Sequence, residues 1–230
     1  MVTALSERPF VNLLEVGPGG GALTKYLVAL ENVNLKCIEI DDEKVAFLTK
    51  TYPQLKGNII HADILQTPLP FDEPFTVVGN FPYNISTQIV FRILEWKGSV
   101  QTMIGMFQKE VAERIAAREG SKIYGVTSVL VQAFYEVEYL FEVSESAFNP
   151  PPKVKSAVIR LTPRENIPDM KTEKKFTVLV KTAFNQRRKT LRNAVRGLFS
   201  ADALTDSIFN KRAEALTVEQ FASLTYLMND

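Results

Sequence analysis

The sequence predicts an α/β domain followed by a small all-helical domain. Short apolar segments rich in β-branched residues alternate with helix-length stretches through the first two thirds of the chain, which is typical of βαβ units around a parallel sheet. Two late apolar runs, residues 136–143 and 156–161, predict strands that close the sheet as an antiparallel pair. Beyond a segment with two prolines, residues 163–169, apolar residues recur every three or four positions, which indicates helices. We therefore expect a Rossmann-like domain over residues 1–163 and a helical domain over residues 170–230.

The elements of the first domain follow one another in a regular order. Each predicted strand is a short apolar run, and the stretch after it has the length of a helix. In chain order we expect a strand at residues 11–16, a helix through about residue 30, a strand at 34–40, a helix from 42 to about 52, a short strand near 59–60, a strand at 75–79, a helix near 86–96, a strand at 100–106, and helices around 109–117 and 125–134. The C-terminal helices are indicated by apolar residues at helical spacing, namely Phe176, Leu179, Val180, Ala183, Phe184, Leu191, Val195 and Leu198.

The composition indicates a globular cytoplasmic protein, with a monomer as the default. No apolar run among the 230 residues approaches the roughly 20 that span a bilayer, and residues 1–10 lack the charged start and apolar middle of a signal peptide. The single cysteine, Cys37, lies in an apolar run and is expected to be a small buried thiol. With one Cys and one His, the chain is not expected to bind zinc.

A glycine-rich turn follows the first strand. Gly17, Gly19 and Gly21 lie where the strand turns into a helix, and their missing side chains let backbone N–H groups approach a ligand. Glu39 ends the second strand, where a doubly wound fold places an acid that accepts hydrogen bonds from both ribose hydroxyls. An ordinary tight turn has similar glycines, and both NAD and S-adenosylmethionine fit this pattern.

Asp63 favours S-adenosylmethionine over NAD. It follows the third strand, where its carboxylate can accept from the adenine amino group of a cofactor stretched across the strand ends. NAD also brings a pyrophosphate that binds at the positive end of a helix, whereas S-adenosylmethionine has no phosphate. A lone Asp here is otherwise a turn or helix cap, so the prediction depends on the ordered set of the glycine loop, Glu39 and Asp63.

The tetrapeptide Asn80-Phe81-Pro82-Tyr83 follows the fourth strand, at the edge of the sheet where ligands bind. An adenine amino group is a poor nucleophile because its lone pair is delocalised into the ring. Acceptors at the Asn80 side-chain oxygen and the Phe81 carbonyl would favour a tetrahedral nitrogen aimed at a methyl group. Pro82 holds that carbonyl outward, and Tyr83 offers a ring face for a flipped-out base. The alternative is a proline turn with Tyr83 in the core.

Four motifs occur in order, namely Leu14-Glu15-Val16-Gly17-Pro18-Gly19, Gly79 to Ser86 around Asn80, Phe148 to Val154, and Ala183 to Asn193. With them the chain resembles the rRNA adenine N6,N6-dimethyltransferases of the kasugamycin-resistance type over nearly its whole length. The resemblance implies a Rossmann-like methyltransferase that uses S-adenosylmethionine to methylate N6 of two adjacent adenosines in the 3′-terminal hairpin of small-subunit (16S) rRNA. The reaction would occur in the pre-30S particle during ribosome biogenesis.

The same resemblance assigns roles to individual residues. Gly17, Glu39, Asp63 and Asn80 would bind the cofactor, and Phe148 would sandwich the target base opposite Tyr83. Two features depart from the family. Phe81 stands where members usually carry Leu, which leaves the backbone carbonyl unchanged. The family's further N-terminal segment, with a Gln-x-Phe-Leu-type motif that touches the cofactor, is missing, so we expect a truncated or partly disordered form or a weaker cofactor site.

Residues 171–196 contain nine Lys or Arg and one Glu, a net charge of +8 in a chain whose net charge is +1. On one continuous helix Arg188, Arg192 and Arg196 would line a single stripe, and an external polyanion would relieve the repulsion between them. A solvated basic helix face is the alternative. The asymmetry favours RNA phosphate contact through this segment, with four candidate residues, Arg187, Arg188, Lys189 and Arg192.

Other classes of protein explain the motifs less well. A zinc deaminase also flips adenine but needs a His/Cys ligand set. An NAD oxidoreductase shares the glycine loop and Glu39 and leaves residues 80–83 unexplained. The methylases of large-subunit rRNA that confer macrolide resistance share the fold and the catalytic loop, but residues 187–193 argue against them. A non-catalytic nucleic-acid-binding relative is the remaining alternative, against which Asn80, Pro82 and Tyr83 speak.

Overall fold

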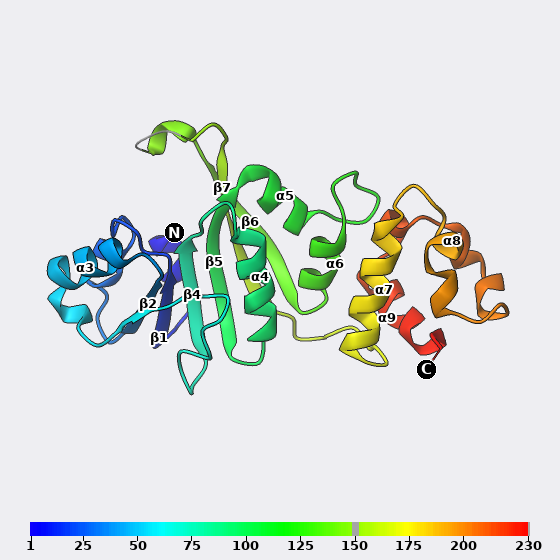
Figure 1. Ribbon diagram of the computed structural model, residues 1–230, viewed down its shortest axis with the longest axis horizontal. Coiled ribbons are helices and arrows are strands. Elements are labelled where there is room, and N and C mark those ends of the chain that lie inside the picture. The colour runs from blue at the N-terminus through cyan, green and yellow to red at the C-terminus, as the bar shows by residue number, and fades with distance from the viewer. Residues whose placement is uncertain (149–151, 230) are drawn as a thin grey trace. The chain divides into compact units, whose positions relative to one another are not determined.

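Seven strands form a single sheet within residues 1–148 and 152–229, the part of the chain that the computed structural model describes. Their order across the sheet is β3-β2-β1-β4-β5-β7-β6, so the chain starts in the middle and moves first to one edge and then to the other (Figure 1). The strands are β1 (Asn12–Val16), β2 (Asn34–Glu39), β3 (Ile59–His61), β4 (Phe75–Asn80), β5 (Val100–Gln108), β6 (Tyr135–Val143) and β7 (Ser156–Pro163).

The pairing of the strands is that of the predicted Rossmann-like sheet. β1 pairs in parallel with β2 and β4, β2 with β3, and β4 with β5, whereas β5 and β7 run antiparallel with Gln108 opposite Ser156. The prediction of a mainly parallel sheet that ends in an antiparallel strand is therefore confirmed. Because the carboxyl ends of β1, β2 and β4 lie at one edge, the residues that follow these strands come together there.

The helices lie near their predicted positions, with two exceptions. They are α1 (Val2–Leu5), α2 (Thr24–Leu27), α3 (Asp42–Thr51), α4 (Ser86–Glu95), α5 (Lys109–Ala116), α6 (Val126–Gln132), α7 (Glu173–Asn185), α8 (Leu191–Val195) and α9 (Val218–Leu224). α2 is much shorter than expected, because the turns of the glycine loop continue to Leu23 and the chain leaves the helix after Leu27. α1 was not predicted, since four residues are too few to show a period.

The first strands of the sheet are buried on both faces. Leu13 and Leu14 are both inaccessible to solvent, as are Val77 and Val78 of the neighbouring strand. This pattern is expected for parallel strands, whose two faces are both covered. Burial on both sides fixes the positions of the strand ends and of the loops that carry the candidate site.

Contacts divide the chain into two compact units. The first contains residues 1–112 and 136–163, and the second contains residues 113–135 and 164–230. In the second unit the side chains of α7 that face inward are buried, and aromatic rings contact one another there: Tyr124 with Phe184 and Phe184 with Phe221. The functional division at residues 163–170 stays a prediction.

No helix in the described part of the chain is long and apolar enough to cross a membrane.

Candidate cofactor and substrate site

The glycine loop between β1 and α2 has the backbone conformation that its sequence requires. Gly17, Gly19 and Gly21 all have positive φ angles, 67°, 55° and 76°. Residues with a Cβ rarely adopt this region. A Cβ at Gly21 would also lie 2.8 Å from the Tyr52 ring. The loop is thus built for close approach of its backbone to neighbouring groups.

Glu39 holds the glycine loop against the end of β2. One oxygen of its buried carboxylate accepts a hydrogen bond from the Gly19 N–H at 3.0 Å, and the other accepts from the N–H groups of Ile40 and Asp41 at 2.9 and 3.1 Å. A carboxylate accepts about four hydrogen bonds. Three acceptor positions are therefore already filled by the protein backbone.

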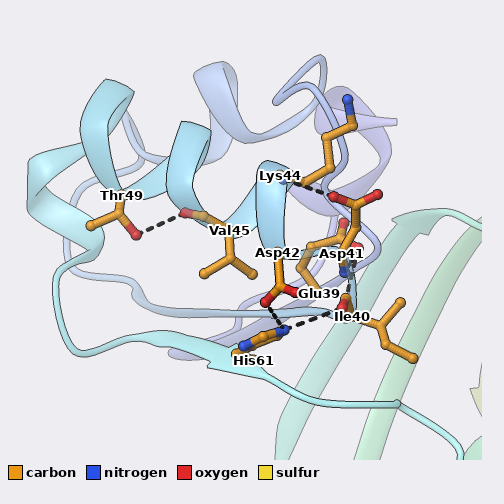
Figure 2. A network of polar contacts seen from close by, with 8 residues as sticks. All are labelled: Glu39, Ile40, Asp41, Asp42, Lys44, Val45, Thr49 and His61. Atoms are coloured by element: carbon orange, nitrogen blue, oxygen red, sulfur yellow. Dashed lines mark hydrogen bonds and ion pairs between the residues drawn. The ribbon is translucent and has the colours of Figure 1, made fainter.

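The loop after Glu39 is fixed from two sides, as Figure 2 shows. The Nε2 atom of His61, at the end of β3, lies 3.2 Å from the Ile40 carbonyl and 3.2 Å from the Asp42 carboxylate. Asp41 caps α3 by accepting from the Lys44 N–H at 3.0 Å. The edge of the site is therefore tied to both β3 and α3.

Asp63 caps the turn after β3. Its carboxylate accepts from the Leu65 N–H at 2.9 Å and from the Gln66 amide at 3.3 Å. It lines a hollow of about 440 Å³ with residues such as Ile60 and Leu69. The structure does not bring Asp63 into the hollow that contains the glycine loop and Asn80.

A larger hollow of about 600 Å³ lies at the carboxyl ends of β1, β4 and β5. Four of the predicted site residues, Gly17, Gly19, Asn80 and Phe148, line it together. Its wall also includes residues that the sequence did not single out, among them Met1, Val2, Thr3, Glu15, Leu23, Tyr26 and Met106. The glycine loop and the end of β4 thus face one common space.

The exposed Asn80 ends β4, and the side chain that follows it turns into the core. The Phe81 N–H donates to the Met106 carbonyl at 3.2 Å, and the ring packs edge-on against Phe107 with centroids 5.1 Å apart. The ring occupies the space left by two glycines: a Cβ at Gly79 would lie 2.6 Å from it, and one at Gly105 would collide with it. The Phe81 side chain therefore anchors the loop and leaves the hollow to its neighbours.

Pro82 and Tyr83 extend the loop toward two different neighbours. The Pro82 ring lies against Gly17, since a Cβ there would be 3.5 Å from it. The half-buried Tyr83 places its hydroxyl oxygen 2.5 Å from the Ser156 hydroxyl oxygen at the start of β7. Tyr83 is thus only partly buried, and its role in stacking a base stays a prediction.

Phe148 is half-buried and packs against an apolar cluster that includes Leu13, Ile104 and Met106. It follows a short 3-10 turn, Glu145–Ala147, and its N–H donates to the Glu145 carbonyl at 3.2 Å. The rest of its motif at residues 149–151 lies outside the described residues.

Glu15 is a candidate that the sequence reasoning missed. It is only 1% exposed, it lines the larger hollow, and it accepts hydrogen bonds from the Thr24 hydroxyl at 2.7 Å and the Cys37 thiol at 3.7 Å. Burial raises the pKa of the Glu15 carboxyl to about 7. The sequence does show an acidic residue inside the apolar run of the first strand. A buried ionisable side chain costs free energy, so such a residue is a candidate for a functional site.

The basic residues do not form one helical stripe, so that expectation is wrong. α7 ends at Asn185 because Gln186 leaves the helical region with φ −120° and ψ 48°, and α8 starts only at Leu191. Arg188 therefore lies in the turn between the helices, Arg192 lies in α8, and Arg196 begins a 3-10 turn. These three side chains therefore lie on successive elements, a turn, α8 and a 3-10 turn, and not on one face of a continuous helix.

The four candidate RNA contacts differ in exposure. Arg188, Lys189 and Arg192 are exposed. Arg187 is half-buried, donates to the Ser121 carbonyl at 3.3 Å, and has its Nε atom 4.0 Å from the Glu214 carboxylate. Arg187 thus already holds a loop within its own unit.

Comparisons with known proteins give consistent findings. Residues 2–230 match the family described as ribosomal RNA adenine dimethylase. Curated relatives named ribosomal RNA small subunit methyltransferase A include one from Cytophaga hutchinsonii, 48% identical over 96% of this chain and 86% of the relative. Another, from Bacteroides thetaiotaomicron, is 54% identical over 94% of this chain and 83% of the relative.

Two solved structures are similar over almost the whole chain. A dimethyladenosine transferase from Plasmodium falciparum has a TM-score of 0.80 and 26% identity, covering 94% of this chain and 91% of that one. The 23S rRNA methyltransferase ErmE has a TM-score of 0.71 and 25% identity, covering 97% and 93%.

Proposed function

The chain belongs to the ribosomal RNA adenine dimethylase family, and on this premise we propose that it transfers methyl groups from S-adenosylmethionine to N6 of adenine in small-subunit rRNA. One observation carries the proposal. Asn80, which ends β4, and the glycine loop after β1 line the same hollow. A methyl donor held by the loop and an adenine held by Asn80 would meet there.

The residues of the larger hollow fit S-adenosylmethionine. A volume of about 600 Å³ suits a ligand of this size. The donor supplies an activated methyl group. Gly17 and Gly19 would let it approach the backbone, and the buried Glu15 would offer an acid to its positively charged groups. Glu39 is not among the residues that line this hollow but is bonded to Gly19, which is; it has acceptor capacity for one ribose hydroxyl, because three of its positions are filled by backbone N–H groups. Asp63 lies outside this hollow, in the smaller one, and we propose that it accepts from the cofactor adenine extending toward it.

The target amino group would be oriented by two oxygen acceptors. The Asn80 side chain is exposed at the strand end, and the Phe81 carbonyl follows it in a loop that the buried Phe81 ring anchors. Hydrogen bonds from N6 to these oxygens localise the nitrogen lone pair and aim it at the methyl group. The nitrogen loses its proton readily once methylated, so no strong base is required.

Two aromatic side chains are proposed to hold the flipped-out base. Tyr83 follows the acceptor loop, and Phe148 lines the hollow beside Asn80. Stacking of a base on an aromatic ring is worth roughly 1 to 3 kcal/mol and does not depend on sequence. Sequence would instead be selected by the RNA structure that presents the base.

The proposal also specifies the RNA substrate and the particle in which it is methylated. We propose that the substrate is a pair of adjacent adenosines in the 3′-terminal hairpin, methylated in the pre-30S particle by a cytoplasmic monomer. Residues 1–163 would carry the chemistry and residues 170–230 would bind rRNA. The exposed Arg188, Lys189 and Arg192 support phosphate contact by the C-terminal region, with Arg187 as a fourth candidate whose side chain is already partly engaged.

The proposal is tested by incubating the protein with labelled S-adenosylmethionine and either immature small subunits or large subunits. Label on adenine of small-subunit rRNA is expected. Label on large-subunit rRNA would favour the function named for the similar ErmE structure. No label on either particle, from protein that still binds small-subunit rRNA, would leave a non-catalytic nucleic-acid-binding relative as the better description.

A further inference from the structure

One polar side chain that contacts the loop after β4 has a position that packing alone does not explain. Ser156 begins β7, and its side chain is completely inaccessible to solvent. The following residues, Ala157 to Leu161, include apolar side chains that are equally buried. A hydroxyl at such a position costs free energy unless it forms a hydrogen bond. The partner of this hydroxyl is therefore informative.

The partner is the phenol of Tyr83, with 2.5 Å between the two oxygens. The residues are 73 positions apart in sequence. The Tyr83 residue is half-buried, whereas Ser156 is completely inaccessible to solvent. The two partners are thus unequally buried. Loss of the phenol leaves a completely buried hydroxyl without this partner, whereas loss of the Ser156 hydroxyl leaves the phenol of a half-buried residue without one.

The backbone at Ser156 is held in place by the pairing of β5 and β7. Ser156 lies opposite Gln108 in the antiparallel pairing of β5 and β7, and the next residue pair is held by a 2.9 Å hydrogen bond from the Lys109 N–H to the Lys155 carbonyl. The phenol oxygen lies on the long axis of the tyrosine ring. Because the Ser156 hydroxyl is fixed, its hydrogen bond determines the direction of this axis. The ring can still rotate about the axis.

We propose that Ser156 is a positioning residue that holds the Tyr83 ring where a flipped-out adenine stacks on it. The bond ties the acceptor loop after β4 to the strand that follows the segment carrying Phe148. It would thereby set the space between the two aromatic residues that receive the base. The role of the base in this inference rests on the proposed function, whereas the coupling between the two hydroxyls does not.

The coupling is tested with S156A, Y83F and the double variant. In thermal denaturation Y83F is expected to lower the melting temperature more than S156A, and adding S156A to Y83F is expected to recover part of that loss, because the orphaned hydroxyl is removed. This measurement needs no substrate, so it is readable even if the protein methylates nothing. Equal and additive losses in the two single variants would overturn the coupling.

Single-turnover methylation of small subunits tests the positioning role. S156A is expected to slow methylation roughly five- to tenfold, as for loss of one orienting hydrogen bond, with the dissociation constant for S-adenosylmethionine unchanged within about twofold. The double variant should be no slower than Y83F. The matched control is S128A, which removes another fully buried serine whose hydroxyl donates to the Arg114 carbonyl at 2.5 Å. S128A is expected to lower stability and leave the rate unchanged.

Two outcomes would overturn the positioning role while leaving the proposed function intact. One is wild-type methylation by S156A. The other is an equal slowing by S128A and S156A at matched stability, which would assign the effect to the fold. If wild-type protein itself transfers no methyl group, the proposed function fails, and the denaturation result still decides the coupling.

Discussion

Asn80 is an exposed polar side chain at the end of a strand whose preceding residues are buried. Such a residue is held rigidly by its backbone and is free to bind through its side chain. We predict that Asn80→Ala lowers the methylation rate by roughly 10²- to 10³-fold, as when one preorganised hydrogen-bonding group is removed from a transition state. Single-turnover rates at saturating S-adenosylmethionine measure this effect. A rate within threefold of wild type, in a folded variant, would show that another group orients N6.

Glu15 gives the protein a pH dependence of its own. The pKa of its carboxyl is about 7 in the folded state, compared with an ordinary value of 4.5. Between these two pH values the folded protein keeps a proton on Glu15 that the unfolded chain has lost. This contribution to stability is complete below pH 4.5 and is lost as the pH rises through about 7.

We therefore predict that the free energy of unfolding of the wild type falls, relative to that of Glu15→Gln, by on the order of 3 kcal/mol across this interval. The glutamine keeps an oxygen that can accept from Thr24 but cannot ionise. Urea denaturation of both proteins at several pH values measures the difference. Parallel curves would mean that Glu15 titrates normally.

At the scale of elements, the anchoring of the acceptor loop depends on the two glycines beneath it. A Cβ at Gly105 would collide with the Phe81 ring and lie 2.7 Å from Phe107. We predict that Gly105→Ala lowers the free energy of unfolding by about 1 to 3 kcal/mol, the usual cost of overpacking, and also slows methylation by shifting the loop. The matched control is Gly98→Ala, at a position where a Cβ meets nothing within 4 Å.

Denaturant unfolding and single-turnover kinetics on the same two variants separate the outcomes. Gly98→Ala should stay within about 0.5 kcal/mol of wild type. Destabilisation by Gly105→Ala without any change in rate would show that the loop tolerates movement of Phe81.

Strand positions were predictable because apolar, β-branched runs bounded by turns determine them. The site at the carboxyl ends of β1 and β4 followed from that order. The buried contacts of Phe81 and the Tyr83–Ser156 bond were not predictable, since they join residues far apart in sequence. The prediction of one basic stripe was wrong because the four-residue spacing of the arginines continues across the turn at Gln186, where the backbone leaves the helix. Glu15 lies inside a glycine-loop motif of the sequence, and its burial and raised pKa appear only in the structure.

At the scale of the whole molecule, charge is unevenly distributed along the chain. Residues 171–196 carry a net charge of +8, so the rest of the chain carries −7. Binding of a polyanion through such a segment releases counterions and weakens as salt rises. Arg188 and Arg192 are exposed there.

We predict that the double variant Arg188→Gln/Arg192→Gln binds small-subunit rRNA less tightly and with a salt slope about 1.5 units shallower, as for two lost phosphate contacts. Fluorescence anisotropy over a range of KCl concentrations measures both. Lys56→Gln, which neutralises an exposed lysine far along the chain from this segment, is the control and should leave the slope unchanged. An unchanged slope in the double variant would place the phosphate contacts elsewhere.

The central claim is that adenine N6 in small-subunit rRNA is the methyl acceptor. Its most direct test is mass spectrometry of nucleosides and mapped fragments from immature small subunits incubated with the protein and S-adenosylmethionine. We predict N6,N6-dimethyladenosine at two adjacent positions near the 3′ end, absent with Asn80→Ala. Methylation of another base, of another atom of adenine, or of large-subunit rRNA alone would contradict it.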